Sequence, residues 1–540
     1  MPFRVKYADP AMNVIRLTVA IAASLACAMN PGAATAQTKT PPSAMSAPLR
    51  STSGAATEMP PVVRPPLPPG AQTVRMDYGP LKVKPGQNLI AVDLLKQRPA
   101  VDGWIVGFRP GMIRVRDKKS PPASDIMLHH AVWLVDFKPT FASGEEKTYV
   151  TAPPGYGWRY TTRQHWLLNH MIHNLTPTPE QVYLTVEIDF IPYDAPEARN
   201  IKEITTRWMD VQGLTPYPVF DVRRNAAKSG RYVYPDDDPK AYKTAPRVRN
   251  RWVVDRDATL VGTIGHVHPG GLYTDLWLER GGRKAHLFRS NARYFDPAGP
   301  VSWDLAMGVT RSNWKVAVIK GDVLSTTATY ETRRGAWYEA MGIMPVGITN
   351  GPDGGADPFT EPVDMREVLS HGRLPENIDS GGRPNPGLSN PLRLKDGPLI
   401  DRVVIKNFSF GQGDLSAGSR AGLPPIVPRG KSLTFINRDP ALTIFHTVTG
   451  CRAPCNKTAG SGFPLANGAP FDSGQLGYGP NINLGTLLPD SDDEVVPITA
   501  AAQRVTFKTP TNLTPGTYTY FCRVHPFMRG AFRVKSNARD

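Results

Sequence analysis

The chain has 540 residues, of which 40% are hydrophobic, and it carries a formal net charge of +16. At about 100–200 residues per domain, this length predicts three domains with hydrophobic cores. The basic residues are scattered, without a nucleic-acid-binding motif or a basic helix. We therefore interpret the charge as a solvated basic surface and expect no nucleic-acid partner.

The first 36 residues have the pattern of an export signal. Basic residues up to Arg16 precede an apolar run from Leu17 to Met29, and small residues follow as far as Ala36. This pattern predicts cleavage after Ala36 and a periplasmic or secreted protein. No later apolar run approaches the roughly 20 residues that a membrane-spanning helix needs, so no transmembrane segment is expected in the mature chain.

The rest of the chain indicates an all-β protein. A proline-rich linker covers 37–71, and short β-like runs separated by Gly and Pro turns follow, with hardly any helical periodicity. We predict β-sandwich domains at 72–205 and 206–379. A second Gly/Pro-rich linker at 380–398 then leads to a C-terminal domain at 399–540.

Adjacent histidines occur in the first predicted domain, at His129 and His130. Neighbouring side chains point to opposite faces of an ideal strand, so both can bind one metal ion only if the backbone twists or bulges there. Further histidines follow in "HWLLNHMIHNLT", at His165, His170 and His173, and the residues alone do not single one of them out.

The second predicted domain contains the pair His266 and His268. Residues i and i+2 of a strand point to the same face, so these two imidazoles can hold one ion. The following residues, Pro269, Gly270 and Gly271, end the strand and leave such a site open.

A third group of ligands lies near the C-terminus, in "FCRVHPFMRG", directly after an alternating aromatic strand. It places Cys522, His525 and Met528 within seven residues. Two histidines, a cysteine and a weak axial methionine form the ligand set of blue-copper electron-transfer sites. That set requires one more histidine upstream, and His446 in "FINRDPALTIFHTV" fits.

Residues from about 400 to 540 resemble the cupredoxins, and the Cys-x-x-His-x-x-Met spacing resembles amicyanin most. The resemblance implies a Greek-key β-sandwich that transfers electrons through a type 1 copper. Its equatorial ligands would be His446, Cys522 and His525, and its axial ligand Met528.

This block departs from the family in its enlarged connection at 447–504, which contains Cys451 and Cys455. In an oxidising compartment the two can form a disulfide, which leaves Cys522 as the odd thiol.

The chain from about 75 to 350 resembles the copper type II, ascorbate-dependent monooxygenases, the group that contains peptidylglycine α-hydroxylating monooxygenase and dopamine β-monooxygenase. In that family a His-His pair and a later histidine hold one copper, and His-x-His with a methionine holds a second. By this resemblance the first copper binds His129, His130 and His173, and the second binds His266, His268 and Met341. His173 is preferred to His170 because the family has a His-Asn near this point.

The resemblance implies two jelly-roll-like domains that hydroxylate a C–H bond with O₂, supplied with electrons by the tethered cupredoxin and a periplasmic donor. Met344, three residues after Met341, is interpreted as a core residue. Ile264 stands where the peptide-amidating enzyme has an arginine, so no anchor for a peptide carboxylate is evident and peptide amidation is not expected. The alternative is a non-catalytic protein that stores copper or carries electrons.

Overall fold

A computed structural model describes much of the chain after the predicted leader. The described residues are 66–86, 89–213, 218–238, 241, 250–296, 299–377, 389–415, 422–439, 444–452, 469–477, 481–483, 496–497 and 504–536. The predicted export signal at 1–36 lies outside them, as does most of the 37–71 linker.

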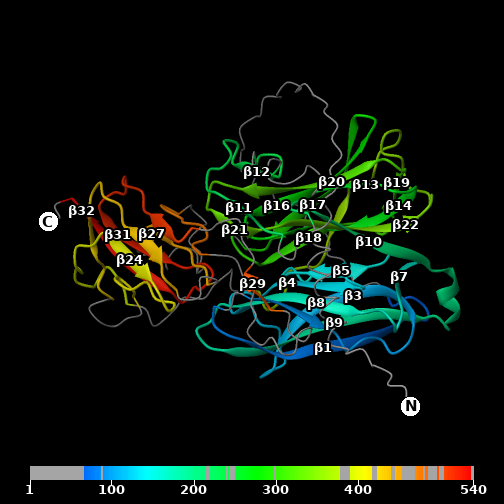
Figure 1. The fold of residues 1–540 in the computed structure, drawn as a ribbon, viewed down its shortest axis with the longest axis horizontal. Helices are drawn as coiled ribbons and strands as arrows, with labels where there is room; N and C mark the ends of the chain where they lie inside the picture. Colours follow the sequence, from blue (N-terminus) through cyan, green and yellow to red (C-terminus); the bar gives the residue numbers. More distant parts are fainter. Residues whose placement is uncertain are drawn as a thin grey trace, which may run out of the picture. The chain divides into compact units, whose positions relative to one another are not determined.

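The chain is all-β, as predicted (Figure 1). The described residues form strands, interrupted by the 3₁₀-helix η1 (Pro196–Asn200). Among these residues, no helix has both the length and the apolar character needed to cross a membrane.

Two sheets form the first sandwich. One contains β1 (Gln72–Val83), β9 (Glu180–Pro192), β3 (Gly103–Arg114) and β7 (Tyr156–Tyr160), with β6 (Val150–Thr151) paired to β3. The other contains β2 (Leu89–Leu94), β8 (Trp166–Asn174), β4 (Ile126–Val135) and β5 (Lys138–Ser143). Phe108 of β3 stacks on Phe141 of β5 with ring centroids 4.3 Å apart, which places the core between the two sheets.

The second sandwich shares a sheet with the first. The shared sheet continues from β7 through β10 (Lys202–Asp210), β22 (Gly342–Asn350), β14 (Ala258–Thr263) and β19 (Val316–Val318), and β15 (His266–Val267) pairs with β22. Because β10 spans the predicted boundary between residues 205 and 206, it is the strand that joins the two halves. The domain boundaries themselves stay a prediction.

A second sheet packs against the continuation of the shared one. It contains β12 (Arg231–Tyr234), β20 (Val323–Glu331), β16 (Gly271–Arg280), β17 (Arg283–Tyr294), β18 (Leu305–Thr310) and β23 (Glu367–Leu369), with β13 (Arg251–Val253) paired to β20. The strands β11 (Phe220–Val222) and β21 (Trp337–Ala340) pair separately. Leu260 of β14 and Phe288 of β17 share one core cluster, and Met344 belongs to it, as the core interpretation required.

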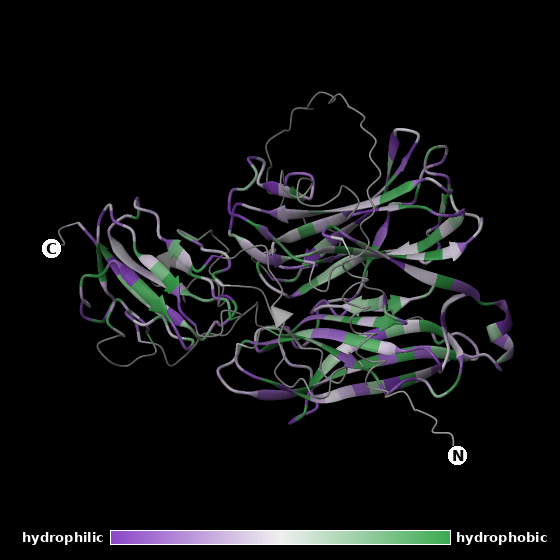
Figure 2. Cartoon of the chain, in the orientation of Figure 1, coloured by the Kyte–Doolittle hydropathy of each residue, from purple (hydrophilic) through white to green (hydrophobic). Residues whose placement is uncertain are grey.

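The C-terminal block has two sheets around an aromatic core that includes Phe410, Phe435 and Tyr520. The first contains β24 (Arg402–Ile405), β26 (Thr434–Asn437) and β30 (Thr506–Lys508), and the second contains β25 (Ile426–Pro428), β32 (Arg529–Lys535), β31 (Gly516–Phe521) and β27 (Thr449–Arg452). Alternation of apolar and polar residues produces these strands, as the colouring in Figure 2 illustrates. In β31, Tyr518 and Tyr520 are buried, whereas Thr519 between them is partly exposed.

The enlarged connection at 447–504 contributes two further strands. They are β28 (Asn481–Asn483) and β29 (Val496–Pro497), and β28 pairs in parallel with β2 of the first sandwich. The connection therefore extends the sheet that carries β8 and β4. The predicted pairing of Cys451 with Cys455 lies outside the described residues and side chains.

Candidate metal centres

A β-bulge in β4 brings both adjacent histidines to one face. The register with β8 shifts between Leu128 and His130, so that His129 is the extra residue. Leu128 and Ala131 on either side point into the first core, and the two histidines project outward from it. Their Nδ1 atoms lie 3.4 Å apart. The backbone irregularity that the adjacent pair requires is therefore present.

The alternation of β8 separates the two candidate third histidines. His170 lies on the face of Leu168 and Ile172, which belong to the first core, and its Nε2 donates a hydrogen bond of 3.2 Å to Asp93. His173 lies on the opposite face. Its ring stacks on that of His129, with centroids 4.6 Å apart.

His266 and His268 approach the same region from the second sandwich. Their ring centroids lie 5.0 Å apart, and His266 Nδ1 donates a 2.9 Å hydrogen bond to Glu146. This bond leaves the Nε2 atom of His266 as the free electron-pair donor, which is the usual way that a carboxylate orients a metal-binding imidazole. The ring of Trp303 lies 4.6 Å from that of His268.

The predicted sixth ligand, Met341, follows β21 and is buried. Its backbone N–H and that of His268 each donate a 3.0 Å hydrogen bond to the hydroxyl of Tyr330, which keeps the two residues adjacent. The Met341 side chain packs in an apolar cluster that includes Met171 and Ile343. The structure thus places the thioether at the contact between the two sandwiches.

The two predicted ligand sets meet, because the ring centroids of His129 and His268 lie only 4.5 Å apart. Sequence reasoning also missed a carboxylate here. Glu339 Oε2 lies 3.2 Å from His129 Nε2, and ligand atoms of His129, His173 and Glu339 all lie within 4.8 Å of one another. The signal available was a lone acidic residue inside the apolar strand "AWYEAM". The assignment of two coppers to these residues stays a prediction.

Burial keeps these imidazoles neutral. Desolvation lowers the pKa of His129 to about 3, and it holds the pKa values of His173 and His268 well below the usual value for histidine. Neutral imidazole is the form that binds a metal ion. The chemistry of this donor set therefore fits a transition metal.

The C-terminal ligands also come together, in a fully buried group. The Sγ atom of Cys522 lies 3.9 Å from His446 Nδ1 and 3.6 Å from His525 Nδ1, and the two Nδ1 atoms lie 3.2 Å apart. Met528 is buried beside them, and its N–H donates a 2.8 Å hydrogen bond to the His525 carbonyl, which closes the ligand loop. The structure therefore gathers all four residues predicted for the blue-copper site.

The residues around Cys522 and His446 favour metal binding at this site. Burial acts to raise the pKa of Cys522, but His525 and His446 outweigh it and hold that pKa well below the usual value for a thiol. The thiolate is the form that binds metals. His446 Nε2 donates a 2.9 Å hydrogen bond to Asp439, so its Nδ1 is left to face the sulfur.

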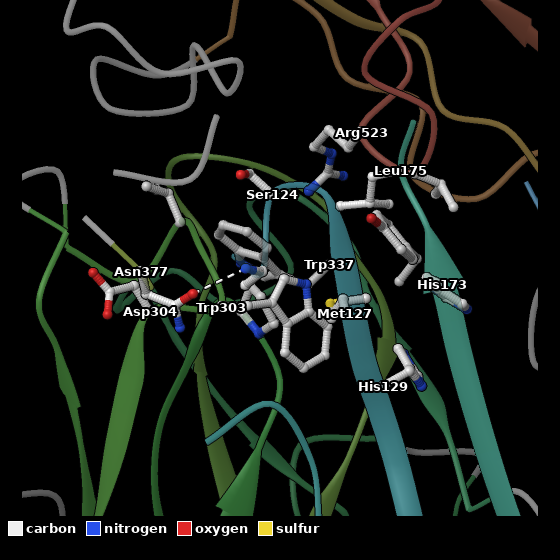
Figure 3. A pocket seen from close by; sticks show the side chains of 15 residues that line it. Ser124, Met127, His129, His173, Leu175, Trp303, Asp304, Trp337, Asn377 and Arg523 are labelled. Carbon is white, nitrogen blue, oxygen red and sulfur yellow. Dashed lines mark hydrogen bonds between the residues drawn. The ribbon is translucent and has the colours of Figure 1, made fainter. Parts of the chain in front are cut away.

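A small cavity lies beside the upstream ligands and reaches the C-terminal ligand loop (Figure 3). His129 and His173 line it from β4 and β8, together with Trp303 and with Arg523 and Val524 of the C-terminal ligand loop. Its volume is about 40 Å³. That is room for a few waters or a diatomic gas, because one water needs about 10–15 Å³ of such volume.

Comparison with known proteins gives only distant similarities. No family model and no curated protein matches the chain. Among solved structures, similarity is found to a purple cupredoxin from Nitrosopumilus maritimus (18% identity, 25% of this chain and 100% of that one, TM-score 0.14). An amicyanin variant in its Cu(I) form matches at 19% identity (28% of this chain and 95% of that one, TM-score 0.14). PNGase F from Flavobacterium meningosepticum matches at 10% identity (53% and 98%, TM-score 0.28). These similarities are too distant to carry a functional conclusion.

Proposed function

We propose that this chain is an exported copper oxidoreductase in which a blue-copper domain passes electrons to a histidine centre between the two upstream sandwiches. The observation that carries the proposal is the buried set of a low-pKa thiolate and two imidazoles, His446, Cys522 and His525, beside a second buried cluster of imidazoles. A thiolate with two imidazoles is the donor set of copper electron-transfer sites.

The contacts between the two groups support intramolecular electron transfer. Tyr338 packs against Phe445, with ring centroids 5.3 Å apart, and Phe445 precedes His446 in the chain. The residue after Tyr338 is Glu339, whose carboxylate lies 3.2 Å from His129. A short route through one pair of packed side chains and two peptide bonds therefore connects the two clusters.

The finer proposal is hydroxylation of a C–H bond by O₂, as the monooxygenase resemblance implies. Bound copper supplies the one-electron chemistry that O₂ reduction requires. In this proposal His266, His268 and Met341 form the catalytic ligand set, whereas His129, His130 and His173 receive electrons from the C-terminal domain. Glu146 holds the ring of His266 in position. An external protein of the periplasm is the electron donor.

The volume of the cavity favours a second candidate function. At about 40 Å³ the cavity is far smaller than the roughly 300–1,000 Å³ of typical pockets for organic ligands. Ile264 also stands where the peptide-amidating enzyme has an arginine, so the anchor for a peptide carboxylate in that enzyme has no counterpart at this position. Both observations fit a protein that carries electrons or stores copper without hydroxylating an organic substrate.

The experiment that separates the two is O₂ consumption by the copper-loaded full chain with a reduced protein donor. We expect consumption of O₂ by the wild type and its loss in Cys522→Ala, which should retain its upstream copper. Hydroxylated product in stoichiometric ratio with O₂ would support the finer proposal. Equal rates for the wild type and Cys522→Ala with every donor would refute electron transfer through the C-terminal domain.

A further inference from the structure

We propose that Glu339 is a metal ligand, and that it forms with His129 and His173 a centre for a divalent transition metal. The three residues come from β21, β4 and β8, and their ligand atoms lie within 4.8 Å of one another. The resemblance to the monooxygenases provides no carboxylate at this place. The inference rests on the proposed function only in taking this cluster as the redox centre.

The burial of the three groups is the first argument. The side chain of Glu339 is completely buried, and that of His129 is 1% exposed. Burial of a carboxylate is costly in free energy, and a cation bound beside it offsets that cost. His129 Nε2 lies 3.2 Å from the carboxylate, so such a cation would be shared with an imidazole.

A ring nitrogen without a hydrogen-bond partner is the second argument. Within the described part of the chain, His173 Nε2 is buried and makes no hydrogen bond. Buried polar atoms in native proteins almost always have a partner, so such atoms call for an explanation. A metal ion explains the nitrogen of His173. The ring of His268, 4.5 Å from that of His129, is then placed to provide a fourth ligand.

The backbone at Glu339 is the third argument. Its φ angle is +50°, in the left-handed region that a residue with a long side chain rarely adopts. Such a conformation costs free energy and occurs preferentially where function requires it. Here it accompanies the approach of the carboxylate to His129.

The donor set decides the class of metal. Two imidazoles and one carboxylate suit divalent first-row ions, whereas Cu(I) prefers softer ligands. Among divalent ions Cu(II) binds such sites most tightly, and Zn²⁺ binds the same imidazole and carboxylate ligands without redox chemistry. In an oxidoreductase, Glu339 would thus stabilise the oxidised state of copper at this centre.

The centre that contains Glu339 and the predicted set of His129, His130 and His173 would use different nitrogens of His129. The predicted set would bind the metal through Nδ1, and the centre with Glu339 would bind it through Nε2. His130 faces the Nδ1 atom of His129 at 3.4 Å, whereas Glu339 faces the Nε2 atom at 3.2 Å. One imidazole cannot give both nitrogens to a single ion. The position of the metal therefore distinguishes the two sets.

Zinc titration of the metal-free full chain tests the inference without depending on redox activity. Glu339→Gln keeps the shape of the side chain and removes its charge, and we expect the chain to bind one zinc ion fewer, or to bind it about 100-fold more weakly. Loss of an outer hydrogen bond already costs about 10–100-fold in metal affinity, and loss of a ligand costs at least as much. His173→Gln should weaken the same ion.

The matched control is Glu367→Gln, the same change at a carboxylate that accepts a 2.7 Å hydrogen bond from Asn291. It should leave the number and affinity of zinc ions unchanged. Wild-type zinc affinity in a folded Glu339→Gln variant would overturn the inference. It would leave the proposed function intact, because electron transfer through Cys522 does not require Glu339 as a ligand.

If Glu339→Gln does not fold, anomalous diffraction from wild-type crystals grown with zinc decides the question. A peak within bonding distance of Glu339 and of His129 Nε2 would support the inference. A peak at the Nδ1 atoms of His129 and His130, away from the carboxylate, would overturn it.

Discussion

Asp439 is expected to set the copper affinity of the C-terminal site without binding copper. Its Oδ2 accepts a 2.9 Å hydrogen bond from His446 Nε2, and both side chains are buried. A carboxylate can only accept here, so in the neutral form that binds copper His446 carries its proton on Nε2 and turns an unprotonated Nδ1 toward Cys522. Asp439→Asn removes that constraint. The amide can donate as well as accept, so the opposite tautomer, with a protonated Nδ1, becomes accessible.

The size of the effect follows from the type of hydrogen bond lost. A buried hydrogen bond that involves a charged group contributes about 1.5–3 kcal/mol. Removing the outer partner of a metal-binding histidine lowers metal affinity by about 10–100-fold, or about 1.4–2.7 kcal/mol. The two ranges agree. We therefore expect Asp439→Asn to bind Cu(II) about 10–100-fold more weakly while it keeps the blue colour, because Cys522 remains.

The assay is competition for Cu(II) between the full chain and a chelator, followed through the visible band. Asp414→Asn is the matched control, since Asp414 is a buried aspartate of the same block. It accepts 2.8 Å hydrogen bonds from the Phe410 N–H and the Ser409 hydroxyl rather than from a ligand. It should lower the stability of the fold but not the copper affinity. If Asp439→Asn binds copper within twofold of the wild type, the orienting role is wrong.

Two further changes have defined outcomes. Cys522→Ser should abolish the intense visible band of the copper-loaded chain, since thiolate-to-copper charge transfer causes it, and a retained band in the absorption spectrum would exclude Cys522 as the ligand. Asp210→Asn should flatten the pH dependence of stability. Burial raises the pKa of Asp210 to about 8, so its contribution to stability is fully present below about pH 4 and is lost as the pH rises from there through 8, by roughly 6 kcal/mol at most. Urea unfolding of the metal-free chain at pH 5 and pH 9 measures it, and an unchanged difference between wild type and variant would contradict the assignment.

Local patterns predicted most of what the C-terminal site contains. The ligands Cys522, His525 and Met528 lie within one loop, and their spacing carries the information directly. The bulge at His129 was also readable, because two adjacent histidines can share a face only if the strand departs from strict alternation. The same alternation explains why His173 and not His170 joins His129, although the residue pattern left both open.

Long-range features were not readable from the sequence. The approach of His129 to His268 depends on how two sandwiches pack, and no periodicity encodes that. Glu146 and Glu339 belong to no motif, and each acquires its role only through a histidine distant in the chain. The pairing of β28 with β2 likewise joins segments about 390 residues apart, as the register of Leu89 with Asn481 shows.

Strand β21 contacts both groups of ligands. Trp337 lines the cavity, Tyr338 contacts Phe445, and Glu339 contacts His129, so three consecutive residues reach three different parts of the site. If the upstream centre binds a metal through Glu339, we expect the contact of Tyr338 with Phe445 to respond, because the two residues Tyr338 and Glu339 are joined by a peptide bond. In that case the packing beside His446 would depend on whether the upstream centre is occupied.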